Sequence, residues 1–367
     1  MSDALASPRA LARAEVRALA LYAPTAAPAC TIDVSDNTNL WGSPPALRRA
    51  LAAAPADALS RYPSLYSVPL RSAILRYAGL GGAANAGVVT GCGSDDVIDA
   101  TMRAFGSAGD RIAFAVPTFS MIPTFARLNG LEPATIPLTP TFDVDPQRLV
   151  DCRAKITYLC TPNNPTGTAL SRAAVSYVAE HARGVVLIDE AYAEFAPDTF
   201  ADLVTRHERV LVTRTFSKAF GAAGLRVGYG IGSTDLVGYV ERARGPYKVN
   251  ALAERAVLAA LGEGDDALGW VRRHAALAVD TRERLAAALD GIGLTPLPSA
   301  ANFVCVPVAR AVSLAKRLGE RGILVRALAG LPQDLAELRR TDGEALRIGV
   351  GPWEVMQSVV DALEGLR

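Results

Sequence analysis

The amino-acid sequence predicts an α/β protein, with a large domain built on a mainly parallel sheet and a smaller α+β domain. Two observations carry this prediction. Between about Gly87 and Gly232, short apolar segments alternate with helical patterns, which is typical of a parallel sheet covered on both faces. Beyond about Asp265 the pattern changes to long helices and short strands. At 367 residues, the chain is also too long for a single compact core.

The predicted large domain spans residues 43–264, and residues 1–42 and 265–367 form the small one. In the large domain, apolar segments predict buried strands at residues 87–90, 111–116, 156–160, 184–189 and 209–215. Helical patterns lie between several of them, at residues 95–105 and 171–182. Ligands of such sheets bind at the carboxyl ends of the strands. We therefore expect functional residues directly after these segments.

The C-terminal part of the small domain is predicted to begin with a long helix over residues 266–291. Short strands follow near residues 303–306, 323–326 and 346–349, and a last helix starts at about residue 353. Residues 327–344 predict an exposed excursion between two of these strands. The chain shows no internal repeat and no low-complexity linker.

The composition excludes several classes of partner. Lys plus Arg (38) nearly balance Asp plus Glu (37), so no excess positive charge indicates a nucleic acid or an anionic membrane. No apolar stretch approaches the length of a membrane span. At the N-terminus, Arg9, Arg13 and Arg17 interrupt the apolar residues at helical spacing. That spacing predicts an amphipathic helix and not a signal peptide.

The cysteines and histidines argue against a metal site. The five cysteines are scattered and no CxxC pair occurs, and the chain has only three histidines. Structural zinc sites need clustered ligands of these types, so we expect no metal. Unpaired, scattered cysteines indicate reduced thiols in a cytoplasmic protein.

The most informative segment is TRTFSKAFGAAGLRVGYG, residues 213–230, which begins at the end of a predicted strand. Lys218 lies there among small and hydroxyl side chains. A lone lysine in a loop is usually a solvent-exposed residue without a specific role. Here Thr215 and Ser217 supply hydroxyl groups, and Arg226 supplies a planar fork suited to phosphate. The combination indicates a lysine that forms a Schiff base beside a phosphate-sized anion site.

The segment VVLIDEAYAEF, residues 185–195, places Asp189 at the end of an apolar strand. The carboxylate is a candidate helix N-cap. In a cofactor enzyme it has another role, because a carboxylate paired with a pyridinium nitrogen keeps that nitrogen protonated and maintains an electron sink. Tyr192, three residues further on, could reach the same ring.

Two turns follow other predicted strands. TPNNPTGT, residues 161–168, forms a rigid turn that presents the amide of Asn164, although turn chemistry alone also explains this segment. GCGSDD, residues 91–96, has a GxG pair but lacks the third glycine of a dinucleotide fingerprint. A single phosphate held by the backbone N–H groups of Ser94 and Asp95 at a helix N-terminus fits better.

Taken together, these segments resemble the class I/II aminotransferases of the fold-type I pyridoxal-phosphate group. The order GxGSDD, PTF, NNPTG, IDEAY, TFSKAFGxAGLR and LRIGVG carries the resemblance, from about Tyr22 to the end of the chain. The histidinol-phosphate aminotransferases are the most similar branch. The resemblance implies a pyridoxal 5'-phosphate enzyme that transfers an amino group from a small amine to a keto acid, expected to be 2-oxoglutarate, in two half-reactions.

The same resemblance implies a role for each site residue. Lys218 would hold the cofactor and move the proton at Cα, and Asp189 would pair with the pyridine nitrogen. Asn164 and Tyr192 would bind the phenolic oxygen, and Phe119 would stack on the ring in place of the usual tyrosine. The residues expected at the cofactor phosphate are Ser94, Asp95, Thr215, Ser217 and Arg226. Tyr62 resembles a tyrosine that reaches the phosphate of a neighbouring subunit, which implies a homodimer with shared sites.

The substrate end is less well defined by the sequence. Arg347 matches the arginine that grips the acidic end of the substrate, and Arg326 and Tyr22 match the histidinol-phosphate branch, where they suit a phosphate ester. Residues 36–42 read DNTNLWG, where that branch has N-E-N-P-x-G, so side-chain recognition could differ. An aromatic amino-acid aminotransferase and a threonine-phosphate decarboxylase therefore stay as alternatives. A ligand-sensing regulator would need a DNA-binding domain, and a nucleotide-dependent dehydrogenase would need the missing glycine.

Overall fold

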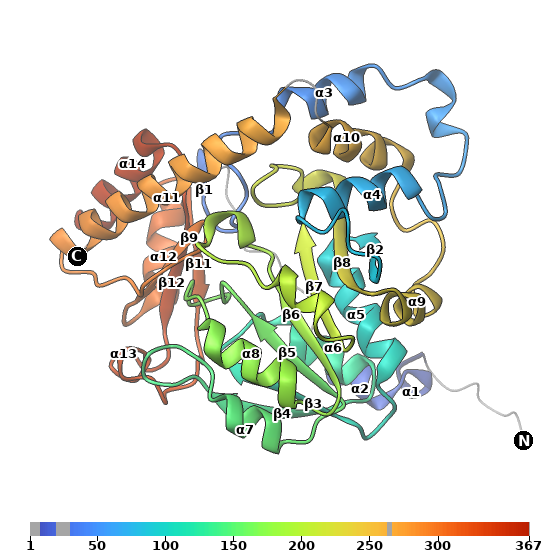
Figure 1. The fold of residues 1–367 in the computed structure, drawn as a ribbon. Helices are drawn as coiled ribbons and strands as arrows, with labels where there is room; N and C mark the ends of the chain where they lie inside the picture. The colour runs from blue at the N-terminus through green and yellow to red at the C-terminus, as the bar shows by residue number, and fades with distance from the viewer. Residues whose placement is uncertain (1–7, 20–29, 263–265, 367) are drawn as a thin grey trace, which may run out of the picture.

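The apolar segments between residues 86 and 233 form a seven-stranded sheet in the order β2-β8-β7-β6-β5-β3-β4 (Figure 1). The structure, a computed structural model, describes residues 8–19, 30–262 and 266–366. The strands are β2 (Ala86–Cys92), β3 (Arg111–Val116), β4 (Glu132–Pro137), β5 (Ile156–Cys160), β6 (Val185–Asp189), β7 (Val210–Thr215) and β8 (Val227–Ser233). Strands β3 to β7 pair in parallel, whereas β8 is antiparallel to both β2 and β7. The predicted α/β class and all five predicted strands of the large sheet are confirmed.

Two strands of this sheet were not expected from the sequence. Strand β4 lies at an edge and contains two prolines, which remove ladder donors and are tolerated only there. Strand β8 carries a glycine at every second position, so its buried apolar side chains, Val227, Tyr229 and Ile231, do not form the continuous apolar segment that marks the other buried strands. The glycines have a packing reason, since a Cβ at Gly228 would lie 2.1 Å from the backbone nitrogen of Ser94. They let the helix that follows β2 pack close against β8.

Helices cover both faces of the large sheet (Figure 1). Those between residues 45 and 261 are α3 (Pro45–Ala52), α4 (Val68–Tyr77), α5 (Ser94–Phe105), α6 (Met121–Leu128), α7 (Pro146–Asp151), α8 (Arg172–His181), α9 (Thr234–Ala243) and α10 (Ala251–Leu261). Short 3-10 helices η1 (Ala56–Leu59), η2 (Ala193–Phe195), η3 (Ala201–Thr205) and η4 (Ala223–Leu225) join them. Side-chain oxygens cap several helices, for example Ser171 on α8 and Asn250 on α10.

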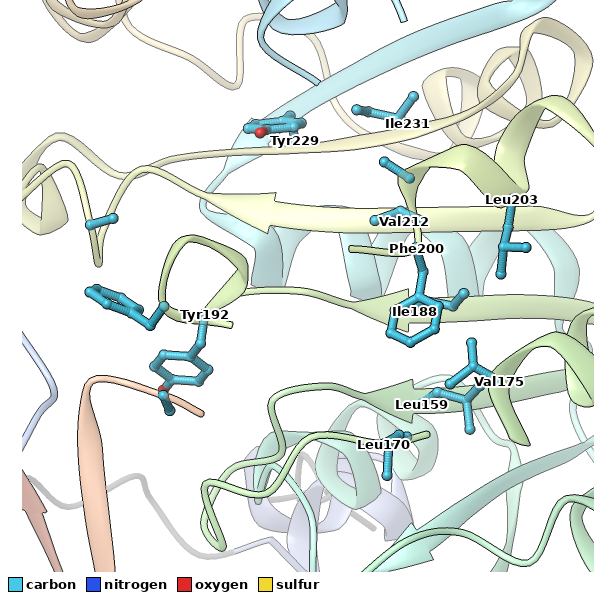
Figure 2. Close-up of a cluster of buried hydrophobic side chains, with 14 of the residues drawn as sticks. Leu159, Leu170, Val175, Ile188, Tyr192, Phe200, Leu203, Val212, Tyr229 and Ile231 are labelled. Carbon is cyan, nitrogen blue, oxygen red and sulfur yellow. The ribbon is translucent and has the colours of Figure 1, made fainter. Parts of the chain in front are cut away.

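The strands of the large sheet send alternate side chains into two apolar clusters. On one face, Leu159, Ile188 and Val212 pack with residues of α8 and η3, as Figure 2 shows. On the other face, Tyr158 and Leu187 pack with residues of α5, α6 and α9. Both faces are therefore buried, which explains why these strands read as continuous apolar segments.

The C-terminal part of the chain forms a second region with an antiparallel sheet in the order β11-β12-β9. Its elements are α11 (Ala267–Gly291), β9 (Phe303–Pro307), α12 (Ala311–Glu320), β10 (Ile323–Leu324), β11 (Arg326–Leu328), α13 (Ala336–Arg339), β12 (Ala345–Gly349) and α14 (Trp353–Glu364). The N-terminal strand β1 (Ile32–Asp33) pairs in parallel with β10. A third apolar cluster lies here, and it includes Val34 from the N-terminal segment. The domain boundaries proposed from the sequence stay a prediction.

Two smaller expectations were wrong in part. The N-terminal pattern forms two short helices, α1 (Pro8–Leu11) and α2 (Ala14–Arg17), instead of one amphipathic helix. The excursion at 327–344 is not simply exposed, because Leu335 and Leu338 are buried in the core cluster of the large sheet. Its first residues extend β11, so the chain turns back over the protein and does not project from it.

Candidate active site

A cavity of about 480 Å³ opens at the carboxyl ends of the parallel strands. Its lining includes Asp189 at the end of β6 and Thr215 at the end of β7, and Ser94 begins the helix after β2. Twelve of the residues predicted for the site line this cavity: Ser94, Asp95, Phe119, Asn164, Asp189, Tyr192, Thr215, Ser217, Lys218, Arg226, Arg326 and Arg347. Residues scattered over most of the sequence are thus brought together by the sheet topology.

Asp189 lies at the floor of the cavity and is 3% exposed. Its carboxylate accepts hydrogen bonds from the Tyr158 hydroxyl at 2.8 Å, from the Ala191 backbone N–H at 3.2 Å and from the Thr213 hydroxyl at 3.3 Å. Burial raises the pKa of Asp189 to about 6, and the Tyr158 hydrogen bond opposes this rise. A positively charged partner within the cavity would stabilise the ionised carboxylate.

Lys218 follows β7 and reaches into the same cavity. Its Nζ donates a hydrogen bond to the backbone carbonyl of Asp36 at 2.9 Å and lies 5.9 Å from the centre of the Tyr192 ring. Burial, assisted by the nearby positive charge of Arg347, lowers the pKa of Lys218 to about 8. A lysine with a lowered pKa holds a usable fraction of neutral amine near neutral pH, as a nucleophile requires.

A pocket for a phosphate-sized anion lies at the N-terminus of α5. The N-cap of this helix is Gly93, which has φ of 81° and no side chain to cap the first N–H groups. Arg226 extends over this turn, and a Cβ at Gly93 would lie 2.7 Å from its Nη2. Its Nη1 lies 3.4 Å from the Ser217 hydroxyl, which accepts a hydrogen bond from the Thr215 hydroxyl at 2.9 Å. Free N–H groups, hydroxyls and a guanidinium converge as an anion site requires.

Tyr192 and Asn164 each hydrogen-bond to a residue from another part of the cavity lining. The Tyr192 hydroxyl accepts a hydrogen bond from Asn37 Nδ2 at 3.0 Å, and burial raises the pKa of Tyr192 to about 12. Asn164 Oδ1 accepts a hydrogen bond from Arg347 Nη1 at 2.7 Å. Since Asn37 donates to Tyr192, the phenolic proton of Tyr192 is available for a further acceptor.

Two arginines lie side by side in the cavity lining and define a second end of the cavity, away from Asp189. Arg326 on β11 and Arg347 on β12 are directly paired in the antiparallel ladder. Arg347 is 8% exposed and donates to Asn164 and to the Ser35 carbonyl, while its Nε is buried without a partner. Arg326 donates to the Asp36 carboxylate at 3.2 Å. A buried guanidinium with an unused donor is suited to an anionic ligand.

The donor set fits pyridoxal phosphate, the cofactor expected from the sequence. The α5 N-terminus and Arg226 suit its phosphate, and the buried carboxyl of Asp189 suits its protonated ring nitrogen. Lys218, which lines the same cavity, suits its aldehyde carbon. Phe119 lines the same cavity and offers a ring face.

Tyr62, a predicted site residue, does not line this cavity. Tyr62 is 83% exposed and stacks on Tyr247 with ring centroids 4.8 Å apart, beside a separate hollow of about 540 Å³. Tyr22 lies outside the described residues.

Sequence reasoning missed several residues that shape the site. The sequence identifies Tyr158 and Thr213 only as parts of buried strands, yet the hydroxyl groups of both donate hydrogen bonds to Asp189. Asn37 was noted within an altered segment but not as the partner of Tyr192. The available signal was positional: Tyr158 and Thr213 stand two residues before the ends of β5 and β7, on strands that flank β6.

Neither a metal site nor a membrane span is found in the part of the chain that the structure describes. There, no group of three or more His, Cys, Asp or Glu side chains could hold a metal ion. None of the helices formed by these residues is long and apolar enough to cross a bilayer.

Comparison with known proteins places this geometry in a family. Residues 31–363 match the family of class I and II aminotransferases. A histidinol-phosphate aminotransferase of Roseiflexus castenholzii is 38% identical over 347 residues, which cover 91% of this chain and 89% of that protein. One from Methanosarcina mazei is 36% identical, with coverage of 92% and 88%. The crystal structure of histidinol-phosphate aminotransferase from Sinorhizobium meliloti in complex with pyridoxal-5'-phosphate has the same fold, with a TM-score of 0.79, 23% identity and 92% coverage of each chain.

Proposed function

The chain belongs to the class I and II aminotransferase family and is a pyridoxal-phosphate-dependent enzyme, and from this premise we propose that it transfers the amino group of L-histidinol phosphate to 2-oxoglutarate. The observation that carries the choice of donor is the pair formed by Arg326 and Arg347 at one end of the cavity. Two adjacent guanidinium groups suit a phosphate dianion better than a single carboxylate. The histidinol-phosphate aminotransferases at 36% and 38% identity support the same donor.

Each cavity residue has a proposed role. Bound pyridoxal phosphate supplies an electron sink for the electron pair left when the Cα–H bond of the donor breaks. Lys218 Nζ accepts the Cα proton and later returns it, which its lowered pKa makes possible. Asp189 holds the ring nitrogen protonated, while Asn164 and Tyr192 bind the phenolic oxygen. Phe119 stacks on the ring, and the phosphate is held by Ser94, Asp95, Thr215, Ser217 and Arg226.

The acidic group of either substrate is proposed to bind Arg347. In the amino donor this group is the phosphate ester, shared with Arg326, and in the acceptor it is the α-carboxylate. The buried Nε of Arg347, which lacks a partner, supports this role. Tyr22 completes the donor phosphate site in this proposal.

We also propose that the enzyme is a homodimer with shared sites. The face around Tyr62 exposes several large apolar side chains: Leu59, Tyr62, Leu65, Tyr66, Val68 and Tyr247. Such a cluster on one face supports burial against another protein surface. In the proposed dimer, Tyr62 of one subunit reaches the cofactor phosphate of the other, as the resemblance implies. A cytoplasmic location is part of the proposal and is supported by Cys30, Cys92, Cys152, Cys160 and Cys305, which are all free thiols.

The experiment that tests the donor is a half-reaction titration. The holoenzyme is mixed separately with L-histidinol phosphate, phenylalanine, tyrosine and threonine phosphate, and the visible absorption of the cofactor is followed. We expect histidinol phosphate to convert the cofactor to its amine form at the lowest concentration. Preference for phenylalanine or tyrosine would refute the proposed donor and leave the family assignment intact. Release of CO₂ from threonine phosphate would indicate the decarboxylase.

The altered segment at residues 36–42 adds Asp36, Asn37 and Thr38 to the cavity lining, and no bulky side chain. Trp41, the bulky residue of the altered segment, packs against the core clusters and does not line the cavity. Thr38 is the residue of that segment whose type differs from the histidinol-phosphate branch and which lines the cavity.

A further inference from the structure

The second end of the cavity contains a carboxylate beside its two arginines. Asp36 Oδ1 accepts a hydrogen bond from Arg326 Nη2 at 3.2 Å, and the Asp36 side chain is 62% exposed. The other acidic residues of the cavity lining are committed elsewhere, Asp95 near Arg226 and Asp189 at the floor. Asp36 therefore shares the donor end with Arg326 and Arg347.

The carboxylate has an electrostatic reason to be there. Arg326 and Arg347 are directly opposite each other across an antiparallel pair, where like charges destabilise a sheet. Burial is the largest cause that lowers the pKa of Arg347, and the positive charge of Arg326 lowers it further. The negative charge of Asp36 acts in the opposite direction. A negative charge at Asp36 thus offsets the repulsion between the arginines. An anionic group of a substrate would offset the same repulsion, so the two compete.

We propose that Asp36 is a specificity-determining residue whose carboxylate is a displaceable counter-ion of Arg326. This inference rests on the proposed function, because the displacing group is the phosphate of the amino donor. Displacement requires only rotation of an exposed side chain, since the backbone carbonyl of Asp36, and not its carboxylate, binds Lys218. Exposed ion pairs of this kind are weak enough to exchange readily. Asp36 weakens the binding of dianionic ligands. It leaves the affinity of ligands that contact Arg347 alone almost unchanged.

The test compares Asp36→Asn and Asp36→Ala with the wild-type holoenzyme. The probe is inorganic phosphate, measured as a competitive inhibitor against whichever amino donor proves active. We expect the inhibition constant to fall about three- to tenfold in both variants, since an exposed ion pair and the repulsion from one carboxylate are removed together. KM for L-histidinol phosphate should fall by a similar factor, whereas KM for phenylalanine, which carries no phosphate, should fall much less.

Matched variants separate a charge effect from a structural one. Asp266→Asn removes the same charge from an exposed pair with Arg273, at 2.7 Å, outside the cavity, and should change none of these constants. Asp36→Glu should restore the wild-type constant for inorganic phosphate. In an Arg326→Gln background, where the ion pair is already absent, Asp36→Asn should improve phosphate binding by a smaller factor than in the wild type.

An unchanged or increased inhibition constant in Asp36→Asn would overturn the inference. The phosphate measurement does not depend on the identity of the donor. If histidinol phosphate is inactive but inorganic phosphate binds more tightly to Asp36→Asn, the donor proposal fails and the role of Asp36 stands. If histidinol phosphate is the preferred donor and phosphate binding is unchanged in Asp36→Asn, the donor proposal stands and the role of Asp36 fails.

Discussion

The two ends of the cavity are held in different ways. At the floor, Asp189 is 3% exposed and accepts hydrogen bonds from three neighbours, all from strands of the large sheet or the turn after β6. At the donor end, Asp36 has a 62% exposed side chain and contacts Arg326 from a different segment of the chain. One carboxylate is fixed by a buried network, and the other is held by an exchangeable ion pair.

The difference follows from what each end must do. Chemistry at the cofactor needs groups whose position and pKa do not change from one substrate to the next, and burial with several hydrogen bonds provides this. Recognition of the donor needs groups that exchange one partner for another within each catalytic cycle. Exposed, weakly bound charges meet that requirement at little cost in stability.

The largest effect expected at the cofactor end is that of Lys218→Ala. Because Lys218 is the proposed nucleophile and the proposed carrier of the Cα proton, its loss should lower the half-reaction rate by about 10⁴-fold or more. The measurement is stopped-flow absorbance with the preferred donor. Cofactor should still bind, but borohydride should no longer attach it covalently to the protein.

Lys316→Ala, on the exposed surface of α12, is the control for Lys218→Ala. It should keep both the wild-type rate and borohydride attachment. Wild-type turnover in Lys218→Ala would remove the basis for calling the buried end catalytic.

The second effect concerns the ionisation of Asp189. Burial raises its pKa from 3.8 to about 6, so the folded protein without cofactor binds this proton more tightly than the unfolded chain does. The resulting stabilisation is present below pH 3.8 and is lost as the pH rises through 6. A shift of this size corresponds to about 3 kcal/mol. Urea unfolding of cofactor-free wild type and Asp189→Asn between pH 4 and 7 should show their stability difference increasing by about this amount in favour of the variant.

Asp361→Asn, which alters an exposed carboxylate of α14, is measured under the same conditions as the control for removing one carboxylate. A constant difference between Asp189→Asn and wild type across this pH range would mean that Asp189 is not held in a desolvated state. The contrast between the two ends of the cavity would then be lost.

The smallest of the three effects is expected for Arg347→Gln at the donor end. Removing a charged hydrogen-bond donor costs about 2 kcal/mol, so KM for both the donor and the keto acid should rise roughly 30-fold. Steady-state kinetics with each substrate varied in turn measures this. Because Arg347 also contacts Asn164, the cofactor spectrum of the variant must match that of wild type. Unchanged KM values for both substrates would remove Arg347 from the recognition site.

The sequence predicted the cofactor end better than the donor end, and the reason is physical. Asp189, Thr215 and Ser94 stand next to strands whose apolar segments are local signals, and parallel strands bring their carboxyl ends to one edge. The contact of Asp36 with Lys218 and Arg326 joins segments far apart in the chain, which no local pattern records. Strand β8 was not predicted because its glycines, which serve close packing, alternate with Val227, Tyr229 and Ile231 and interrupt the apolar segment.

The pairing of β1 with β10 has a consequence for how the protein is made. Residues 30–38 leave the ribosome early, but Ile32 pairs with Ile323, and Ser35 and Asp36 contact Arg347 and Arg326. At typical bacterial or eukaryotic rates of synthesis, these partners emerge roughly 15–60 s later. The large sheet can form during that interval, whereas the donor end cannot. Translation products that stop before β12 would therefore contain Asp189 and Lys218 but lack Arg347, the arginine proposed to bind the substrate, so we expect amino-group transfer only after β12 has been synthesised.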